Sequence, residues 1–77
     1  MKFFSKQLFR MEISINQKFS EVPEHYSVQQ LLFSIFPENQ KGIAVAINQH
    51  VVPKSNWATQ FLMPQDSVTL IKATQGG

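Results

Sequence analysis

The residues with the clearest chemical potential stand at the end of the chain, where Gly76 and Gly77 follow Gln75. Only three of the 77 residues are glycine, and two of these form the terminal pair. Glycine has no Cβ atom, so a Gly-Gly end can enter a channel too narrow for any other dipeptide. Its carboxylate is ionised at neutral pH, and it can attack the α-phosphate of ATP held by a partner. The alternative is a frayed end that glycine merely tolerates.

Other residues with catalytic or metal-binding potential are few. The chain has no cysteine, which excludes a disulfide framework, a thiolate metal site and a cysteine nucleophile. The two histidines, His25 and His50, stand in separate predicted loops, and neither has a paired carboxylate. Two isolated histidines do not make a zinc site. No Ser-His-Asp order and no glycine-rich phosphate loop occurs. We therefore expect no metal and no bound cofactor.

Size and charge exclude further classes of function. A chain of 77 residues and 8.8 kDa is one small domain, without room for an ordinary cleft between two lobes. Residues 1–10 hold three of the seven basic residues and no acid, which leaves four lysines against five acids in residues 11–77. This body lacks the basic cluster of a nucleic-acid surface, and no segment approaches the roughly 20 apolar residues of a membrane span. We expect no nucleic acid, no membrane and, because cysteine-free chains suit a reducing compartment, a cytoplasmic location.

The first ten residues, MKFFSKQLFR, differ in pattern from the rest of the chain. Lys6 interrupts the apolar stretch that a secretory signal needs. We expect residues 1–10 to be an N-terminal extension, either disordered or a non-native start with Met11 as the true first residue. A basic amphipathic arm that contacts a membrane or a partner is the alternative. Residues 11–77 then form the domain, with a flexible C-terminal tail at 74–77.

The pattern of residues 11–22 predicts an N-terminal hairpin. Residues 11–15 alternate apolar and polar side chains, as a half-buried strand does. Asn16 and Gln17 supply a tight turn, although without the glycine of the strongest hairpin signal. Residues 18–22 resume an extended run in which we expect Phe19 to be buried.

A single helix is predicted after Pro23. Ser27 as N-cap and Gln30 three residues later form a capping box, and Pro37 ends the helix. Phe33 lies off the apolar face. That face is formed by residues spaced at helical intervals, namely Val28, Leu31, Leu32, Ile35 and Phe36.

Three more strands are predicted in the second half of the chain. The run IAVAI at 43–47 is too short for a helix and rich in β-branched residues, and residues 51–52 form a short strand before Pro53. We expect Trp57 and Val51 to fill the core at the sheet edge. The last strand, 67–73, places Val68 and Leu70 inward and Thr69 and Ile71 outward.

One helix cannot cover both faces of a sheet, so the order of these elements predicts an α+β fold. We expect a mixed sheet of four to five strands packed on one helix, with the first and last strands side by side in the centre. This arrangement resembles the β-grasp of ubiquitin-like domains. Thr69 and Ile71 then border the tail and are candidate docking contacts. Lys72 either meets an acidic partner surface or is simply solvated.

Residues 44–77 resemble the sulfur carrier family of thiamine biosynthesis, the ThiS family. The matching features are Asn48, the Val-Val-Pro run at 51–53, Trp57, the turn at Asp66 and the Gly-Gly end. The preceding residues from Met11 match in pattern but less specifically, and Gln65 stands where the family usually has glycine, which bears on the geometry of that turn.

The resemblance implies that an E1-like adenylyltransferase uses ATP to adenylate Gly77, that a sulfur-relay protein supplies the sulfur of a thiocarboxylate, and that thiazole synthase takes this sulfur. Gly76 and Gln75 would thread into the partner. The protein would be a co-substrate and not an enzyme, and a monomer when free. The alternatives are a carrier like the small subunit of molybdopterin synthase, a β-grasp interaction module with an inert tail, and a conjugating modifier.

Overall fold

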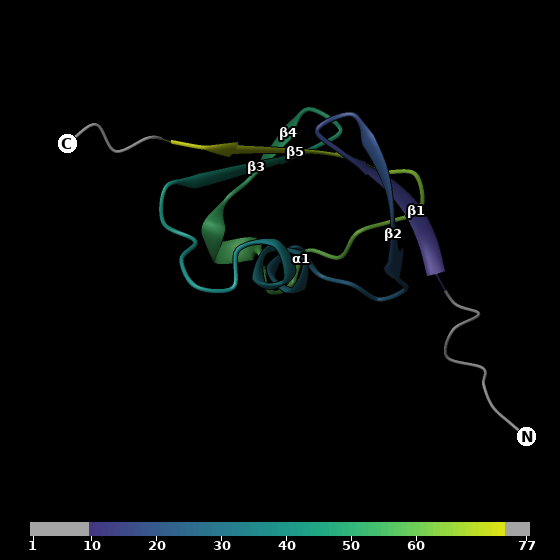
Figure 1. Ribbon diagram of the computed structural model, residues 1–77, viewed down its shortest axis with the longest axis horizontal. Helices are drawn as coiled ribbons and strands as arrows, with labels where there is room; N and C mark the ends of the chain where they lie inside the picture. Colours follow the sequence, from purple (N-terminus) through teal and green to yellow (C-terminus); the bar gives the residue numbers. More distant parts are fainter. Residues whose placement is uncertain (1–9, 74–77) are drawn as a thin grey trace, which may run out of the picture.

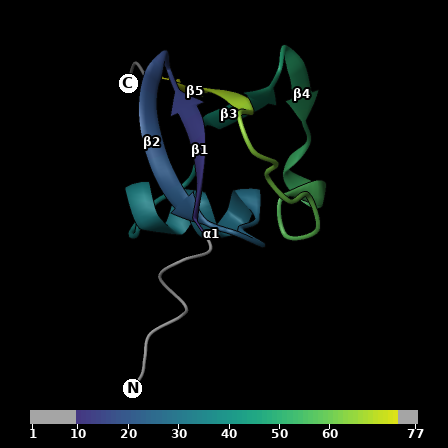
Figure 2. The same cartoon turned by 90° about the vertical axis from the view of Figure 1, so that its right-hand side faces the viewer.

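The computed structural model describes residues 10–73, which form a five-stranded sheet and one α-helix (Figure 1). The elements are, in chain order, β1 (Arg10–Ile15), β2 (Lys18–Pro23), α1 (Val28–Ile35), β3 (Ile43–Ile47), β4 (His50–Val52), the 3₁₀ helix η2 (Lys54–Asn56) and β5 (Ser67–Lys72). Figures 1 and 2 agree that α1 lies against one face of the sheet. The predicted α+β β-grasp architecture is therefore confirmed.

The sheet places the first and last strands next to each other, as the sequence predicts. Its strand order is β2-β1-β5-β3-β4, so β5 is the middle strand. β1 and β5 run parallel, and the other neighbouring pairs are antiparallel. The parallel pairing is short, because it joins only Ser14 with Ser67 and Ile15 with Val68.

Both antiparallel hairpins are closed by the dipeptide Asn-Gln. Asn16 and Gln17 have φ of 50° and 72°, and Asn48 and Gln49 have φ of 51° and 72°. Positive φ at both central residues defines the type I′ turn, whose twist matches that of the flanking strands. Asparagine tolerates this conformation better than most residues. His50, which the sequence places in a loop, begins β4 instead.

The predicted capping box starts α1. The Ser27 hydroxyl accepts a hydrogen bond from the Gln30 amide at 3.1 Å, and the Gln30 side chain accepts one from the Ser27 amide at 2.9 Å. The helix ends at Ile35, two residues before Pro37. Of the predicted apolar face, Val28, Leu31 and Leu32 are buried, Phe36 is half-buried, and Ile35 is exposed.

A single core lies between the sheet and α1. Trp57 is buried in it, as predicted, and its indole Nε1 donates a hydrogen bond to the Val52 carbonyl at 3.0 Å. Among the other members, Ile13, Leu32, Val28, Val45 and Val68 are the largest fully buried side chains.

The predicted burial of Phe19 and Val51 is wrong, because these side chains are 79% and 75% exposed. The strand register explains both errors. β2 turns Val22 toward the core, opposite Met11, so Phe19 lies on the other face. In β4 it is Val52 that points inward, and Val51 is directed away from α1.

Residues 1–9 lie outside the described residues, so the predicted extension is not tested there. Arg10, assigned by sequence to the extension, belongs to β1, and its Nε lies 3.4 Å from Glu21 Oε1. Within residues 10–73, no helix has the length and apolar character needed to cross a membrane.

Candidate functional site

Gln75, Gly76 and Gly77 lie outside the described residues, so their predicted roles remain predictions. The structure does describe the strand that precedes them. β5 is the middle strand of the sheet and ends at Lys72. The next amide, that of Ala73, donates a hydrogen bond to the Gly42 carbonyl at 2.7 Å. Residues 74–77 therefore follow directly from the strand that has neighbours on both sides.

The start of β5 is fixed by two residues of the family motif, Asp66 and Asn48. The buried Asp66 carboxylate accepts hydrogen bonds from the Met63 amide at 2.8 Å and from Asn48 Nδ2 at 3.0 Å. Asn48 Oδ1 in turn accepts the Ser67 amide at 3.0 Å. The side chains of these two motif residues thus connect the β3–β4 turn to the beginning of β5.

Gln65 occupies the turn before Asp66 with φ of 69°. This left-handed conformation is the one that glycine adopts without steric cost, which accounts for the glycine expected there from the family resemblance. The turn forms nevertheless, and the Gln65 amide donates to the Glu12 carbonyl at 2.6 Å. The departure from the family pattern therefore places strain at one residue and leaves the entry into β5 intact.

Thr69 and Ile71 are exposed on the sheet face away from α1, as predicted, and Ile71 is 61% exposed. The register places Ala44 beside Ile71, and Ala46 between Thr69 and Val51. None of these five side chains carries a charge. Together they form what we call the outer patch, which lies next to the end of β5. Sequence reasoning missed the contribution of Val51, because it assigned that residue to the core.

Lys72 does not share the outer patch. Residues paired across two antiparallel strands point to the same face, so Lys72 points to the same side as its neighbour Ile43, whose side chain belongs to the core. Its ammonium nitrogen lies 5.3 Å from the centre of the Phe36 ring, within the range of a cation–π interaction. The structure therefore divides the three predicted docking residues between two faces.

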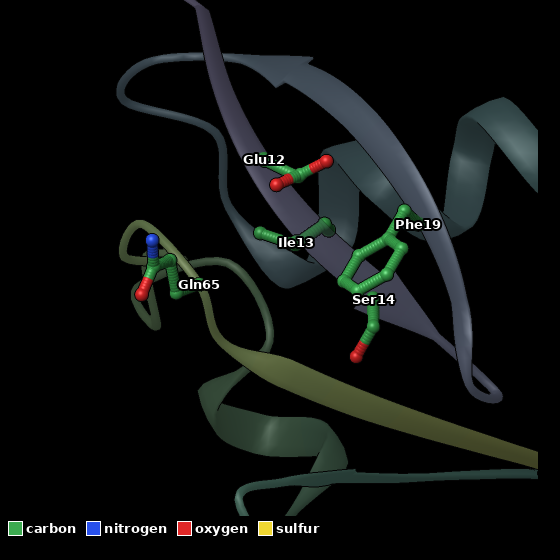
Figure 3. A pocket seen from close by; sticks show the side chains of 5 residues that line it. All are labelled: Glu12, Ile13, Ser14, Phe19 and Gln65. Carbon is green, nitrogen blue, oxygen red and sulfur yellow. The ribbon is translucent and has the colours of Figure 1, made fainter.

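A hollow on the outer face lies at the other end of β5 (Figure 3). Its lining comes from β1, β2 and the turn before β5, namely Glu12, Ile13, Ser14, Phe19 and Gln65. Since Ser14 pairs with Ser67, the first residue of β5, this hollow is about six residues of strand, roughly 20 Å, from Ala73. It is thus remote from the point where the tail begins.

The two histidines lie on different elements. His25 is in the connection between β2 and α1, with φ of 60°, and His50 begins β4. Among residues 10–73, no group of three or more histidine, cysteine or carboxylate side chains is arranged to hold a metal ion.

A mixed five-stranded sheet on one helix, with the first and last strands adjacent, defines a ubiquitin-like β-grasp domain, and the sequence continues from its middle strand to a Gly-Gly end. The model of the ThiS family matches residues 7–77, so the chain belongs to the ThiS family.

One similar protein supports the family and one similar structure supports the fold. The sulfur carrier protein ThiS of Escherichia coli K12 is 31% identical over 67 residues, which are 87% of this chain and 100% of that protein. The crystal structure of the thiamine biosynthesis protein ThiS from Geobacter metallireducens has a TM-score of 0.75 at 23% identity, over 87% of this chain and 100% of that one. At this identity the second likeness shows the fold.

Proposed function

We propose that this protein carries sulfur on the carboxyl group of Gly77 for the synthesis of the thiazole of thiamine. Membership of the ThiS family and the similarity to the Escherichia coli sulfur carrier support the proposal. The observation that carries it is the attachment of the Gly-Gly end to β5, the middle strand of a β-grasp sheet, whose outer face bears the uncharged outer patch. A partner that binds the folded domain at this patch can therefore also bind the tail that continues from β5.

The proposed chemistry takes place on the terminal carboxylate. An oxygen of the Gly77 carboxylate attacks the α-phosphorus of ATP on an E1-like activating enzyme, and pyrophosphate leaves. The outer sulfur of a persulfide on a relay protein then attacks the acyl-adenylate carbonyl and displaces AMP, which forms an acyl disulfide. A thiol next attacks the relay-protein sulfur of this S–S bond, forms a mixed disulfide with it and leaves the thiocarboxylate on Gly77. The resulting thiocarboxylate gives its sulfur to thiazole synthase. Because glycine has no Cβ atom, Gly76 can follow Gly77 into a narrow channel, with Gln75 at its mouth.

In this proposal the protein is a co-substrate, and its partners supply the catalytic groups and bind the ATP. No step requires a metal or a resident cofactor on this chain. We further propose a monomer in the free state and a cytoplasmic location, in agreement with the cysteine-free sequence.

We propose that the outer patch docks on an apolar area of the activating enzyme. Thr69 and Ile71 lie on the strand that leads to the tail, so a partner that holds them also fixes where the tail begins. The patch is uncharged, and burying it therefore requires no desolvation of an ion. Lys72 points toward α1 and remains a separate candidate, for an acidic partner surface on that side.

The terminal chemistry can be tested by ATP–pyrophosphate exchange with the purified activating enzyme. We expect exchange with the full chain and none with a chain lacking Gly77, because the carboxylate would then lie one residue short. Gly77→Ala should also fail if the channel is as narrow as proposed, whereas Gln75→Ala should retain most of the activity. Undiminished exchange by the chain without Gly77 would overturn the proposal.

The docking surface can be tested by a matched pair of variants on the same sheet face. Ile71→Asp places a charge beside the tail, and Phe19→Asp places one at the distant hollow, at a side chain that is even more exposed. We expect Ile71→Asp to raise the KM for the carrier about tenfold, equivalent to ~1.4 kcal/mol, and Phe19→Asp to change it little. Equal changes in KM for both variants would show that the outer patch is not part of the interface.

A further inference from the structure

The turn between β1 and β2 contacts the middle of β5, at Val68 and Leu70. The backbone amide of Asn16 donates a hydrogen bond to the Val68 carbonyl at 2.9 Å. Its side chain continues this pairing, because Oδ1 accepts the Leu70 amide at 2.8 Å and Nδ2 donates to the Leu70 carbonyl at 3.2 Å. The side-chain amide of Asn16 thus takes the place that a backbone peptide of a longer β1 would occupy.

This contact determines how far β5 is held on its β1 side. The pairing of β1 with β5 ends at Ile15, so without the Asn16 side chain the hydrogen bonds described on this side would stop at Val68. On the opposite side, β3 continues to bond β5, and the Gly42 carbonyl reaches the Ala73 amide. Asn16 therefore decides whether β5 is bonded on its β1 side as far as Leu70 or only as far as Val68.

The second Asn-Gln turn shows that this role belongs to the position of Asn16 and not to the turn type. Asn48 has the same backbone conformation, with φ of 51° against 50°. Its side chain bonds the Ser67 amide and the Asp66 carboxylate, at the beginning of β5. The Asn48 side chain therefore holds the beginning of β5, whereas the Asn16 side chain holds Leu70 in its second half, nearer to the tail.

We propose that Asn16 is a positioning residue for the reactive terminus, an inference that rests on the proposed function. By securing Leu70 it adds a second anchor to the second half of β5, which β3 and the Gly42 carbonyl otherwise hold from one side alone, and so limits the motion of the strand from which the tail continues. Without this bond, more residues must be ordered when the activating enzyme captures the tail, which weakens binding. The chemistry at Gly77 is unaffected once the tail is bound, so the change appears in KM and not in kcat.

The test compares Asn16→Gly with Asn48→Gly in the full chain. Glycine accepts the positive φ of both turns, so each variant loses one side-chain amide and keeps its turn. The first readout is hydrogen exchange at the Ile71 amide. By strand alternation this amide faces β3 and not Asn16. We expect faster exchange in Asn16→Gly, and no comparable change in Asn48→Gly once both are corrected for global stability.

The second readout is ATP–pyrophosphate exchange with the activating enzyme. We expect Asn16→Gly to raise the KM for the carrier about three- to tenfold at unchanged kcat, and Asn48→Gly to change it less than about twofold. Asn16→Asp keeps the acceptor for the Leu70 amide, so its KM should lie between those of Asn16→Gly and the wild type. Unchanged Ile71 exchange in Asn16→Gly, or equal KM effects of the two glycine variants, would overturn this inference. Absence of exchange with the wild-type chain would instead refute the proposed function.

Discussion

Gln65 gives the most specific prediction about stability. Its φ of 69° lies in the left-handed region, which costs a residue with a Cβ atom about 1–2 kcal/mol. Gln65→Gly removes this cost. It also adds conformational freedom to the unfolded chain, which lowers the free energy of unfolding by roughly 0.4–1 kcal/mol. We therefore expect a net stabilisation of about 0.5–1 kcal/mol, equivalent to a rise in Tm of roughly 2–8 °C for a domain of this size.

The assay is urea unfolding followed by Trp57 fluorescence, with thermal unfolding as a second measure. Gln65→Ala is the matched control, because it removes the same side chain and keeps the Cβ atom. The Gln65 amide, which bonds the Glu12 carbonyl, is present in both variants. Equal stabilisation by alanine would show that the side chain and not the backbone conformation is responsible. A neutral or destabilising Gln65→Gly would refute the reasoning.

Three further variants test the packing that holds β5 and α1, each by urea unfolding followed by circular dichroism, because Trp57→Phe removes the single tryptophan. Asp66→Ala leaves two N–H donors without their buried acceptor and should cost about 2–4 kcal/mol; a loss below ~1 kcal/mol would contradict this. Trp57→Phe removes the bond to the Val52 carbonyl and part of a buried ring, for a cost of about 1–2 kcal/mol, and unchanged stability would show that the bond is dispensable. Ser27→Ala removes the N-cap of α1 and should cost about 1 kcal/mol; no loss of stability would mean that the cap contributes nothing.

The elements that were predictable from sequence are those whose signals are local. The capping box of Ser27 and Gln30 lies within four residues, and the alternation of residues 11–15 requires one strand only. The alternation of β5 likewise predicted which of its side chains face outward. In each case the physical cause, an unpaired helix amide or a strand with two unlike faces, is contained in the segment itself.

The burial of Phe19 and Val51 was not predictable in this way. Both lie in the edge strands β2 and β4, which carry apolar side chains on both faces, so alternation alone does not identify the inward face. That choice depends on register, which places Val22 opposite Met11 and Val52 opposite Val45.

The contacts that secure β5 were also beyond sequence reasoning. Asn16 and Leu70 are 54 positions apart, and Asn48 and Ser67 are 19 apart. The positive φ of the two turns already explains why asparagine stands at both positions, so the sequence gives no reason to expect a further role for these side chains. Only the fold brings their side chains to two separate points of the middle strand, Ser67 and Leu70, where they bond its backbone.

The most direct measurement is intact-mass analysis of the protein isolated from cells starved of thiamine. If the terminal carboxyl group is the working part of the molecule, a fraction of the protein gains the mass difference between one sulfur and one oxygen atom. Fragmentation then places that change at Gly77. Cells that are actively making thiazole but hold this protein only with an unmodified terminus would contradict the account.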